Sequence, residues 1–177
     1  MSEKNTVSLT KGFVHKFADD INTDYIISSR YKRDTTDCNI LKKYIFADIR
    51  DDFYGKIQTG DILICGSNFG CGSAMEVAAM VLRAAGFSII IAKSFARSFY
   101  RNAMNNGIIL IEADSDIFSE GIEVEVMLEE DGLLKAQIGT SQESVLLGKL
   151  SHINKALYDE GGLINYVNKY GRLPVYS

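Results

Sequence analysis

The sequence predicts an α/β fold with a βαβαβ core, in which the strands are parallel, and an added antiparallel hairpin. In the middle of the chain, three short apolar runs alternate with two helical patterns, and parallel neighbouring strands need crossover connections of this kind. Two alternating segments on either side of a turn signal follow, as in a hairpin. No Gly/Ser-rich or charged linker divides the chain, so we expect residues 1–177 to form a single domain.

The segment before the core carries less regular signals. Residues 7–17 mix β-branched and aromatic residues in loose alternation, which predicts a strand, and the polar run at 19–24 predicts a turn. We expect a short strand at 25–29, a loop at 30–37 and a short helix at 39–46. The charged tip of that loop is a candidate mobile segment.

The core itself gives the clearest pattern. Its two helices carry apolar residues on one face, and glycines follow them at Gly86 and Gly107, where a helix commonly ends. The expected core elements are a strand at 61–65, a helix at 73–85, a strand at 88–92, a helix at 94–106 and a strand at 108–111.

Beyond the core, the sequence pattern changes from apolar runs to alternating segments. Residues 122–128 and 133–138 alternate around a Glu-Asp-Gly turn signal, which predicts the hairpin, and a candidate further strand lies at 145–147. Residues 151–170 form a helical pattern that is interrupted at Gly161-Gly162.

Composition restricts the classes of partner. The chain has 19 Lys plus Arg against 23 Asp plus Glu, for a net charge of −4, and lacks a basic block. We therefore expect neither nucleic acid nor an anionic membrane as a partner. No apolar run approaches the roughly 20 residues of a membrane span, and the first twenty residues lack a signal-peptide pattern, so we expect a cytoplasmic protein.

The cysteines and histidines do not suggest a metal site. Cys38, Cys65 and Cys71 are odd in number and irregularly spaced, which favours reduced thiols over a disulfide framework. The histidines are His15 and His152, and neither lies near a cysteine in the sequence. We expect this chain to bind no metal, so a metal-dependent reaction would need ligands from another chain.

A glycine-rich turn, Gly66–Ser73, joins a predicted strand to a predicted helix, where backbone N–H groups converge on an anion. It lacks the Gly-Lys-Ser/Thr of a P-loop and the glycine spacing of a dinucleotide site. Ser73 and Glu76 fit a capping box, so the Ser73 hydroxyl either caps the helix or faces a substrate, and the two roles can coexist.

Two nucleophiles lie in this turn. A helix N-terminus lowers the cost of negative charge on Ser73 by only about 0.3–1 kcal/mol, and no histidine is near in sequence, so a Ser/His/Asp hydrolase fits poorly. Cys71 is either a nucleophile or a small thiol in a tight turn, and the second is the favoured interpretation.

Several motifs carry a family resemblance. Gly66–Ser73 with Glu76, and the block Ala92–Gly107, resemble the 3-isopropylmalate dehydratase small subunits of the aconitase family. The Asp20–Asp24 run (DINTD) is similar to the opening motif of those subunits, and residues 161–167 are similar to their terminal helix. The match spans almost the whole chain.

The resemblance implies a swivelling β/β/α domain that closes over a separate large subunit. That subunit holds a [4Fe-4S] cluster through its own cysteines, so we expect no cofactor on this chain. In the family, one iron acts as a Lewis acid on the substrate hydroxyl and a carboxylate, and a serine of the swivelling domain removes the proton from the adjacent carbon. By motif position that catalytic serine is Ser73. The expected partners are the large subunit, in a heterodimer or heterotetramer, and a small hydroxy-dicarboxylate.

The sequence departs from the family directly after the turn. The usual Ser-Ser-Arg-Glu-His is here Ser73-Ala74-Met75-Glu76-Val77, so the catalytic serine is kept while the second serine, the carboxylate-binding arginine and the histidine are absent. Loss of a bidentate arginine weakens carboxylate binding unless another cation substitutes. Either the substrate carries an apolar group there, or Arg30, Lys32 or Arg33 supplies the cation.

Further candidates come from motif position. Gly72, Ala74 and Met75 flank Ser73 and are expected to contact substrate. The loop at 31–36 matches the specificity loop of the family, and Arg33 is our leading specificity residue, the alternative being a solvated charge.

Four more polar residues lie in the motifs that carry the resemblance. Asp24 either orients polar groups in the closed complex or forms an Asx turn. Lys93, Ser94 and Arg97 begin the second core helix and contact either substrate or the partner subunit, with Ser94 alternatively serving as the N-cap.

The expected function is that of a small subunit that isomerises 2-isopropylmalate to 3-isopropylmalate, in leucine biosynthesis, by dehydration and rehydration. The alternatives are a related dehydratase of dimethylmalate, citramalate or homoaconitase type, and a catalytically idle binding subunit. Retention of Ser73 with its glycine turn favours activity, whereas Ala74 and Met75 argue against the ordinary substrate.

Overall fold

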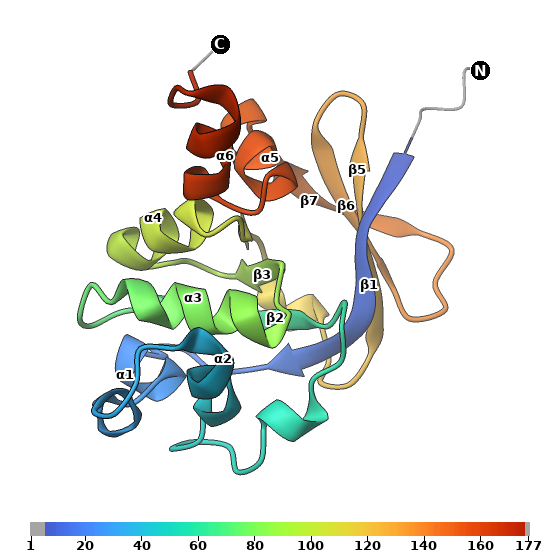
Figure 1. Ribbon diagram of the computed structural model, residues 1–177. Coiled ribbons are helices and arrows are strands. Elements are labelled where there is room, and N and C mark those ends of the chain that lie inside the picture. The colour runs from blue at the N-terminus through green and yellow to red at the C-terminus, as the bar shows by residue number, and fades with distance from the viewer. Residues whose placement is uncertain (1–5, 176–177) are drawn as a thin grey trace.

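A computed structural model describes residues 6–175, which form a seven-stranded mixed sheet with helices packed against it (Figure 1). The strand order is β4-β3-β2-β1-β5-β6-β7. Strands β1 to β4 are parallel, and β1, β5, β6 and β7 pair antiparallel, so the predicted α/β fold with a parallel core and an added hairpin is confirmed. The strands are β1 (Thr6–Lys16), β2 (Ile62–Cys65), β3 (Ile89–Ala92), β4 (Ile109–Glu112), β5 (Glu123–Glu129), β6 (Leu133–Ile138) and β7 (Ser144–Lys149).

Strand β1 belongs to both halves of the sheet. Its residues from Thr6 to Phe13 pair antiparallel with β5, and those from Val14 to Lys16 pair in parallel with β2. A register shift between Ser8 and Thr10 bends the pairing with β5. The sequence predicts this strand but not its double role, because pairing partners distant in sequence leave no local signal.

The parallel strands are buried on both faces. Successive side chains point to opposite faces of a sheet, and in β2 Leu63 and Cys65 join one core cluster while Ile62 and Ile64 join the other. The first cluster packs against helices α1 to α4, and the second packs against residues of the antiparallel strands. The result is a layered β/β/α arrangement, in which continuous apolar strands are the expected pattern.

The helices gather beside the parallel strands (Figure 1). Helix α3 ends at Gly86, as predicted, in the left-handed conformation that glycine adopts most easily. Helices α5 and α6 meet at the Gly161-Gly162 interruption, which is also confirmed. The α-helices are α1 (Thr23–Ile26), α2 (Cys38–Leu41), α3 (Glu76–Ala85), α4 (Arg97–Asn105), α5 (His152–Asp159) and α6 (Leu163–Tyr170). The 3₁₀ helices are η1 (Ser29–Lys32), η2 (Lys42–Tyr44), η3 (Tyr54–Lys56) and η4 (Ser115–Ile117).

Two local predictions are wrong. The strand expected at 25–29 is a helical turn, α1, because the Asn22 side chain accepts a hydrogen bond from the Tyr25 amide and caps it. The buried neighbours Ile26 and Ile27 follow this turn rather than the alternation of a strand. The loop expected at 30–37 begins with η1.

The two core helices begin three residues later than predicted. Helix α3 starts at Glu76 and α4 at Arg97, with Met75 and Ala96 as N-caps that make no side-chain capping bond. The residues before each helix are used instead in turns that follow β2 and β3.

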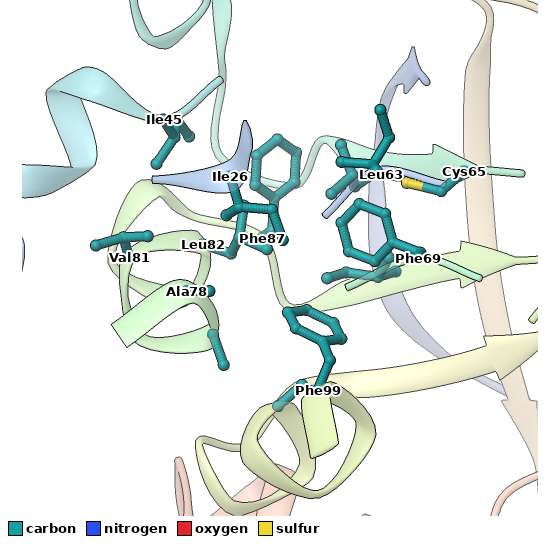
Figure 2. Close-up of a cluster of buried hydrophobic side chains, with 14 of the residues drawn as sticks. Ile26, Ile45, Leu63, Cys65, Phe69, Ala78, Val81, Leu82, Phe87 and Phe99 are labelled. Atoms are coloured by element: carbon teal, nitrogen blue, oxygen red, sulfur yellow. The ribbon is translucent and has the colours of Figure 1, made fainter. Parts of the chain in front are cut away.

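A buried aromatic cluster connects these turns to the core (Figure 2). Phe69 of the glycine-rich turn packs edge-on against Phe99 of α4, with ring centroids 5.1 Å apart. Leu63 and Cys65 of β2 and Ile26 of α1 belong to the same cluster. The turn is therefore anchored by a buried side chain at its centre.

Candidate active site

The candidate site lies where β1, β2 and β3 end. Because parallel strands end at the same edge of the sheet, the connections at 17–22, 66–75 and 93–96 meet there. This edge is where open α/β sheets bind ligands. The structure thus brings together the DINTD motif, the glycine-rich turn and the start of the Ala92–Gly107 block.

The glycine-rich turn is held from both sides by backbone hydrogen bonds. The Gly70 amide donates to the Ile21 carbonyl at 2.8 Å, which ties the turn to the connection after β1. The Phe69 amide donates to the Ser94 carbonyl at 3.0 Å, and the Ala96 amide donates to the Phe69 carbonyl at 2.9 Å. These bonds fix the turn between its two neighbours.

Ser73 is positioned by Thr23. The Thr23 amide donates to the Cys71 carbonyl and its hydroxyl donates to the Ser73 carbonyl, both at 2.9 Å. Thr23 is 1% exposed. It therefore fixes the backbone on both sides of Gly72, whose φ of +88° suits glycine.

The Ser73 side chain is exposed, and its hydroxyl has no hydrogen-bond partner within residues 6–175. The capping-box hypothesis is therefore wrong, since α3 begins at Glu76 and Ser73 lies in the turn before it. The hydroxyl is left available to an incoming ligand.

Backbone amides next to Ser73 are also available. The N–H groups of Gly72, Ser73 and Ala74 donate to no acceptor in the described part of the chain. Successive free amides beside a glycine with positive φ form a small concave donor site that suits a carboxylate oxygen. Gly72, Ser73 and Ala74 can therefore contribute their backbones to binding.

Two of the candidate cations are engaged by acidic residues. Arg30 pairs with Asp48 and lies over the Tyr31 ring. Lys93 Nζ lies 2.7 Å from Asp116 Oδ2, and this hydrogen bond raises the pKa of Lys93 and lowers that of Asp116. Both cations are therefore already paired with a carboxylate of this chain.

The other cations differ in their surroundings. Lys32 Nζ lies 2.7 Å from Met75 Sδ, and both residues are half-buried. Arg33, directly after η1, and Arg97, the first residue of α4, are exposed and have no acidic partner among the residues described. The structure thus brings Lys32, rather than Arg33, next to Met75.

Asp24 and Ser94 have structural partners. Asp24 is exposed and accepts a hydrogen bond from the Ser29 hydroxyl at 3.2 Å, and the capping role proposed for it as an Asx turn belongs to Asn22. Ser94 is not the N-cap of α4. Its hydroxyl accepts a hydrogen bond from the backbone N–H of Asn68 at 2.8 Å and so braces the glycine-rich turn.

Sequence reasoning missed Thr23 and a brace across the base of the turn. Asp19 Oδ1 accepts from the Ser67 amide at 2.6 Å, and Asp20 Oδ1 accepts from the Asn68 side chain at 2.8 Å. Asp20 and Asn68 both have positive φ, which these two residue types tolerate best after glycine. The sequence signal that could have identified these residues is their position in or next to the DINTD and glycine-rich motifs.

Neither the cysteines nor His15 form a metal or catalytic cluster in this site. No group of three His, Cys, Asp or Glu residues within 6–175 is placed to hold a metal ion. Cys71 Sγ lies 3.6 Å from the Asp20 carbonyl oxygen. His15 pairs with buried Asp61, its Nε2 2.6 Å from Oδ2, at the opposite end of β2 from the turn.

The donor set of this chain does not fit an iron-sulfur cluster. Cys65 is wholly buried, and burial raises the pKa of its thiol well above the ordinary value. Cys38 is the first residue of α2, and burial together with the neighbouring Asp37 charge raises its pKa. Among the described helices, none is long and apolar enough to cross a bilayer.

Comparison with known proteins places this arrangement among relatives. A family model described as the aconitase C-terminal domain matches residues 4–116. Small subunit 1 of the 3-isopropylmalate dehydratase of Thermotoga maritima is 41% identical over 170 residues, which cover 94% of this chain and 99% of that protein. The methanogen homoaconitase small subunit of Methanocaldococcus jannaschii is 38% identical over 161 residues, which cover 91% of this chain and 92% of that one.

A solved structure extends the likeness to three dimensions. The crystal structure described as 3-isopropylmalate dehydratase from Methanocaldococcus jannaschii matches with a TM-score of 0.75 and 37% identity, covering 92% of this chain and 95% of that chain. The coverage includes the antiparallel half as well as the parallel core.

Proposed function

The chain belongs to the aconitase family as the small subunit of a hydro-lyase, and from this we propose that it completes the active site of a 3-isopropylmalate dehydratase. The reaction would convert 2-isopropylmalate to 3-isopropylmalate, as in leucine biosynthesis. The observation that carries the proposal is the Ser73 hydroxyl, exposed and unbonded at the edge of the sheet.

The proposed role of Ser73 is that of the base that removes a proton from the carbon next to the one bearing the hydroxyl. A neutral serine is a weak base, so it needs preorganised surroundings that favour negative charge. The amides of Gly72, Ser73 and Ala74 support this role, because they donate to no acceptor within residues 6–175 and can stabilise negative charge next to the hydroxyl. In rehydration the same hydroxyl returns the proton.

The proposed partner is a large subunit that carries a [4Fe-4S] cluster, which would weaken the C–O bond of the substrate hydroxyl when bound. The relatives are named as small subunits, which supports a large-subunit partner. The misfit of this chain's own cysteines supports placing the cluster on that partner. We further propose a heterodimeric or heterotetrameric complex that acts in the cytoplasm and is active only when assembled.

A second candidate is a related malate dehydratase of dimethylmalate, citramalate or homoaconitase type. The replacement of the family arginine by Met75 favours it, and so does the similarity to a homoaconitase small subunit. Arg33 is exposed directly after η1 and remains the proposed residue for recognising the substrate side group. Turnover of 2-isopropylmalate, dimethylmalate and homocitrate by the same complex would rank the candidates.

The direct test is Ser73→Ala in the complex with the large subunit. We expect the turnover number for an unsaturated dicarboxylate to fall by two to four orders of magnitude, the usual contribution of a general base, with the fold unchanged by circular dichroism. Ser67→Ala is the matched control, since Ser67 lies in the same turn and contributes its amide rather than its hydroxyl to the brace. Near-normal turnover of the Ser73→Ala complex would remove Ser73 from the role of base, and no activity in the wild-type complex would contradict the proposed function.

A further inference from the structure

An ion pair between Arg50 and Glu120 completes the backbone hydrogen bonding of β1 at the end nearest the site. We infer that these two side chains are positioning residues for the reaction. By holding Lys16, the last residue of β1, they fix the connection at 17–22, which in turn supports the turn that carries Ser73. This role rests on the proposed function, because it assigns further residues to the same site.

On the side of β5, β1 loses its strand partner before it reaches the site. The Val14 amide donates to the Ile122 carbonyl at 2.9 Å, and the Gly121 amide donates to the Val14 carbonyl at 2.8 Å. Lys16 faces the same side, because alternate residues of a strand direct their backbone N–H and C=O groups the same way. Among the described strands, none pairs with Lys16 on that side, since the pairing with β5 ends at Phe13. The N–H and C=O groups of Lys16 therefore need partners from elsewhere.

Arg50 and Glu120 supply both partners. The Lys16 amide donates to Glu120 Oε2 at 2.5 Å, and Arg50 Nη2 donates to the Lys16 carbonyl at 2.6 Å. Arg50 Nη1 donates to Glu120 Oε1 at 3.0 Å, which closes a ring of hydrogen bonds. A planar guanidinium suits this place because its donors form a rigid fork that reaches two acceptors at once. The two side chains thus stand in for a neighbouring strand.

Buried aromatic rings hold the guanidinium in place. The Arg50 Cζ atom lies 4.2 Å from the centroid of the Phe17 ring and 5.4 Å from that of the Phe53 ring, and a cation is attracted to the face of such a ring. Phe17 in turn stacks on buried Phe46, with ring centroids 4.2 Å apart. Because Phe17 directly follows Lys16, Arg50 contacts both the end of β1 and the start of the connection to the site.

The connection after β1 links this ion pair to the candidate base. The Ile21 carbonyl accepts from the Gly70 amide at 2.8 Å, and Thr23 holds the carbonyls of Cys71 and Ser73. A displaced end of β1 would therefore move the support of the glycine-rich turn. A shift of a fraction of an ångström at the reacting groups is enough to slow proton transfer.

Hydrogen exchange in the free chain, followed by NMR, tests the structural part of this role without any need for activity. We expect Arg50→Met to accelerate exchange of the Gly70 and Thr23 amides about tenfold or more. The amide of Ala136, in the middle of the antiparallel half, should be accelerated several times less, because the loss is local. Glu120→Ala should give the same pattern.

Glu123→Ala is the matched control. Glu123 is an exposed carboxylate of β5 whose oxygen lies 3.4 Å from Lys11 Nζ, so the variant also breaks an ion pair beside β1. That pair makes no hydrogen bond to the end of β1 among the described contacts. Its loss should leave the exchange of the Gly70 and Thr23 amides at the wild-type rate.

Turnover of 2-isopropylmalate by the complete two-subunit complex tests the functional part. We expect Arg50→Met and Glu120→Ala each to lower the turnover number about tenfold with little change in KM, since they position the base rather than bind substrate. The double variant should lose no more than the more affected single variant, because the two side chains act as one unit. Glu123→Ala should keep the wild-type turnover number.

The outcomes separate this role from the proposed function. Equal acceleration of exchange at Gly70, Thr23 and Ala136 would overturn the role, because it would indicate a loss of overall stability alone. Wild-type turnover in Arg50→Met, or additive losses in the double variant, would also overturn it. A wild-type complex that does not isomerise 2-isopropylmalate would contradict the proposed function, and exchange in the free chain would then decide whether the ion pair positions the turn.

Discussion

Thr23 shows how one buried hydroxyl sets the geometry of a candidate catalytic residue. Its amide and hydroxyl hold the carbonyls of Cys71 and Ser73, on either side of the glycine that turns the chain. Thr23→Val keeps the shape and the amide bond but removes the donor to the Ser73 carbonyl. Movement of Ser73 by a fraction of an ångström is enough to slow proton transfer.

For Thr23→Val we expect the turnover number of the complex to fall about tenfold or more while KM changes little, with about 1 kcal/mol lost from the free energy of unfolding. Thr23→Ser, which retains the hydroxyl, should recover most of the turnover. Steady-state kinetics and urea unfolding provide the two measurements. Equal kinetics for Thr23→Val and wild type would show that the hydroxyl does not position Ser73.

At the residue scale, motif position in the sequence located Ser73 and its neighbours, but not their hydrogen bonds. The structure leaves the Ser73 hydroxyl without a partner among the described residues, whereas the local sequence favoured a capping role for it. Of the three cations considered there, Lys32 contacts Met75, a residue 43 positions away, and no local sequence pattern predicts that contact. Thr23 was missed because a threonine between polar neighbours has no local mark of burial.

At the scale of elements, the glycine-rich turn depends on close packing against α4. A Cβ placed on Gly70 would lie 2.2 Å from Phe99 Cγ, and the Gly70 φ is +78°. Since Phe99 is buried among other aromatic rings, it has little room to yield. The turn and α4 must therefore move apart if a side chain is added there.

We expect Gly70→Ala to lower the free energy of unfolding by about 2 kcal/mol or more, through overpacking and backbone strain together. Gly86→Ala is the matched control, because its φ is +113° and nothing lies within 4 Å of an added Cβ, so it reports the strain alone. Urea unfolding of both variants measures the difference. A loss for Gly70→Ala no greater than that for Gly86→Ala would contradict the packing argument.

Periodicity predicted the strands of the core and the glycines that end its helices, because these depend on burial and on local conformation. It failed where a side-chain cap or a turn competed with it. Asn22 caps a helical turn where a strand was expected, and the residues before Glu76 and Arg97 form turns instead of the first turns of helices. These failures lie at the candidate site, where the chain departs from regular structure.

At the scale of the whole molecule, Cys65 links pH to stability. It is wholly buried at the end of the parallel strand β2, and burial raises its pKa well above the ordinary value. A thiol whose pKa is higher in the folded than in the unfolded chain gives its full stabilisation below the unfolded pKa of about 8.5. That stabilisation is lost as the pH rises above this value towards the folded pKa.

We therefore expect the free energy of unfolding to fall above about pH 8.5, with a contribution from Cys65 of up to about 1.4 kcal/mol per pH unit. Urea unfolding from pH 7 to 10 measures it against Cys65→Ala, which lacks the titrating group and should show a shallower decline. The smaller side chain shifts the whole curve but not its slope. Parallel pH profiles for the two proteins would contradict this role of Cys65.

The double role of β1 has a consequence for synthesis on the ribosome. The last residues of β1 pair with β2, which follows within the first 65 residues, but Thr6 pairs with Glu129 and Phe13 with Glu123. The parallel half can assemble as soon as β4 has emerged, while the first half of β1 waits as an open edge until β5 is made. An open strand edge is a site for pairing between chains. The nascent polypeptide is therefore prone to aggregation from the time the parallel half forms until β5 is synthesised and pairs with β1.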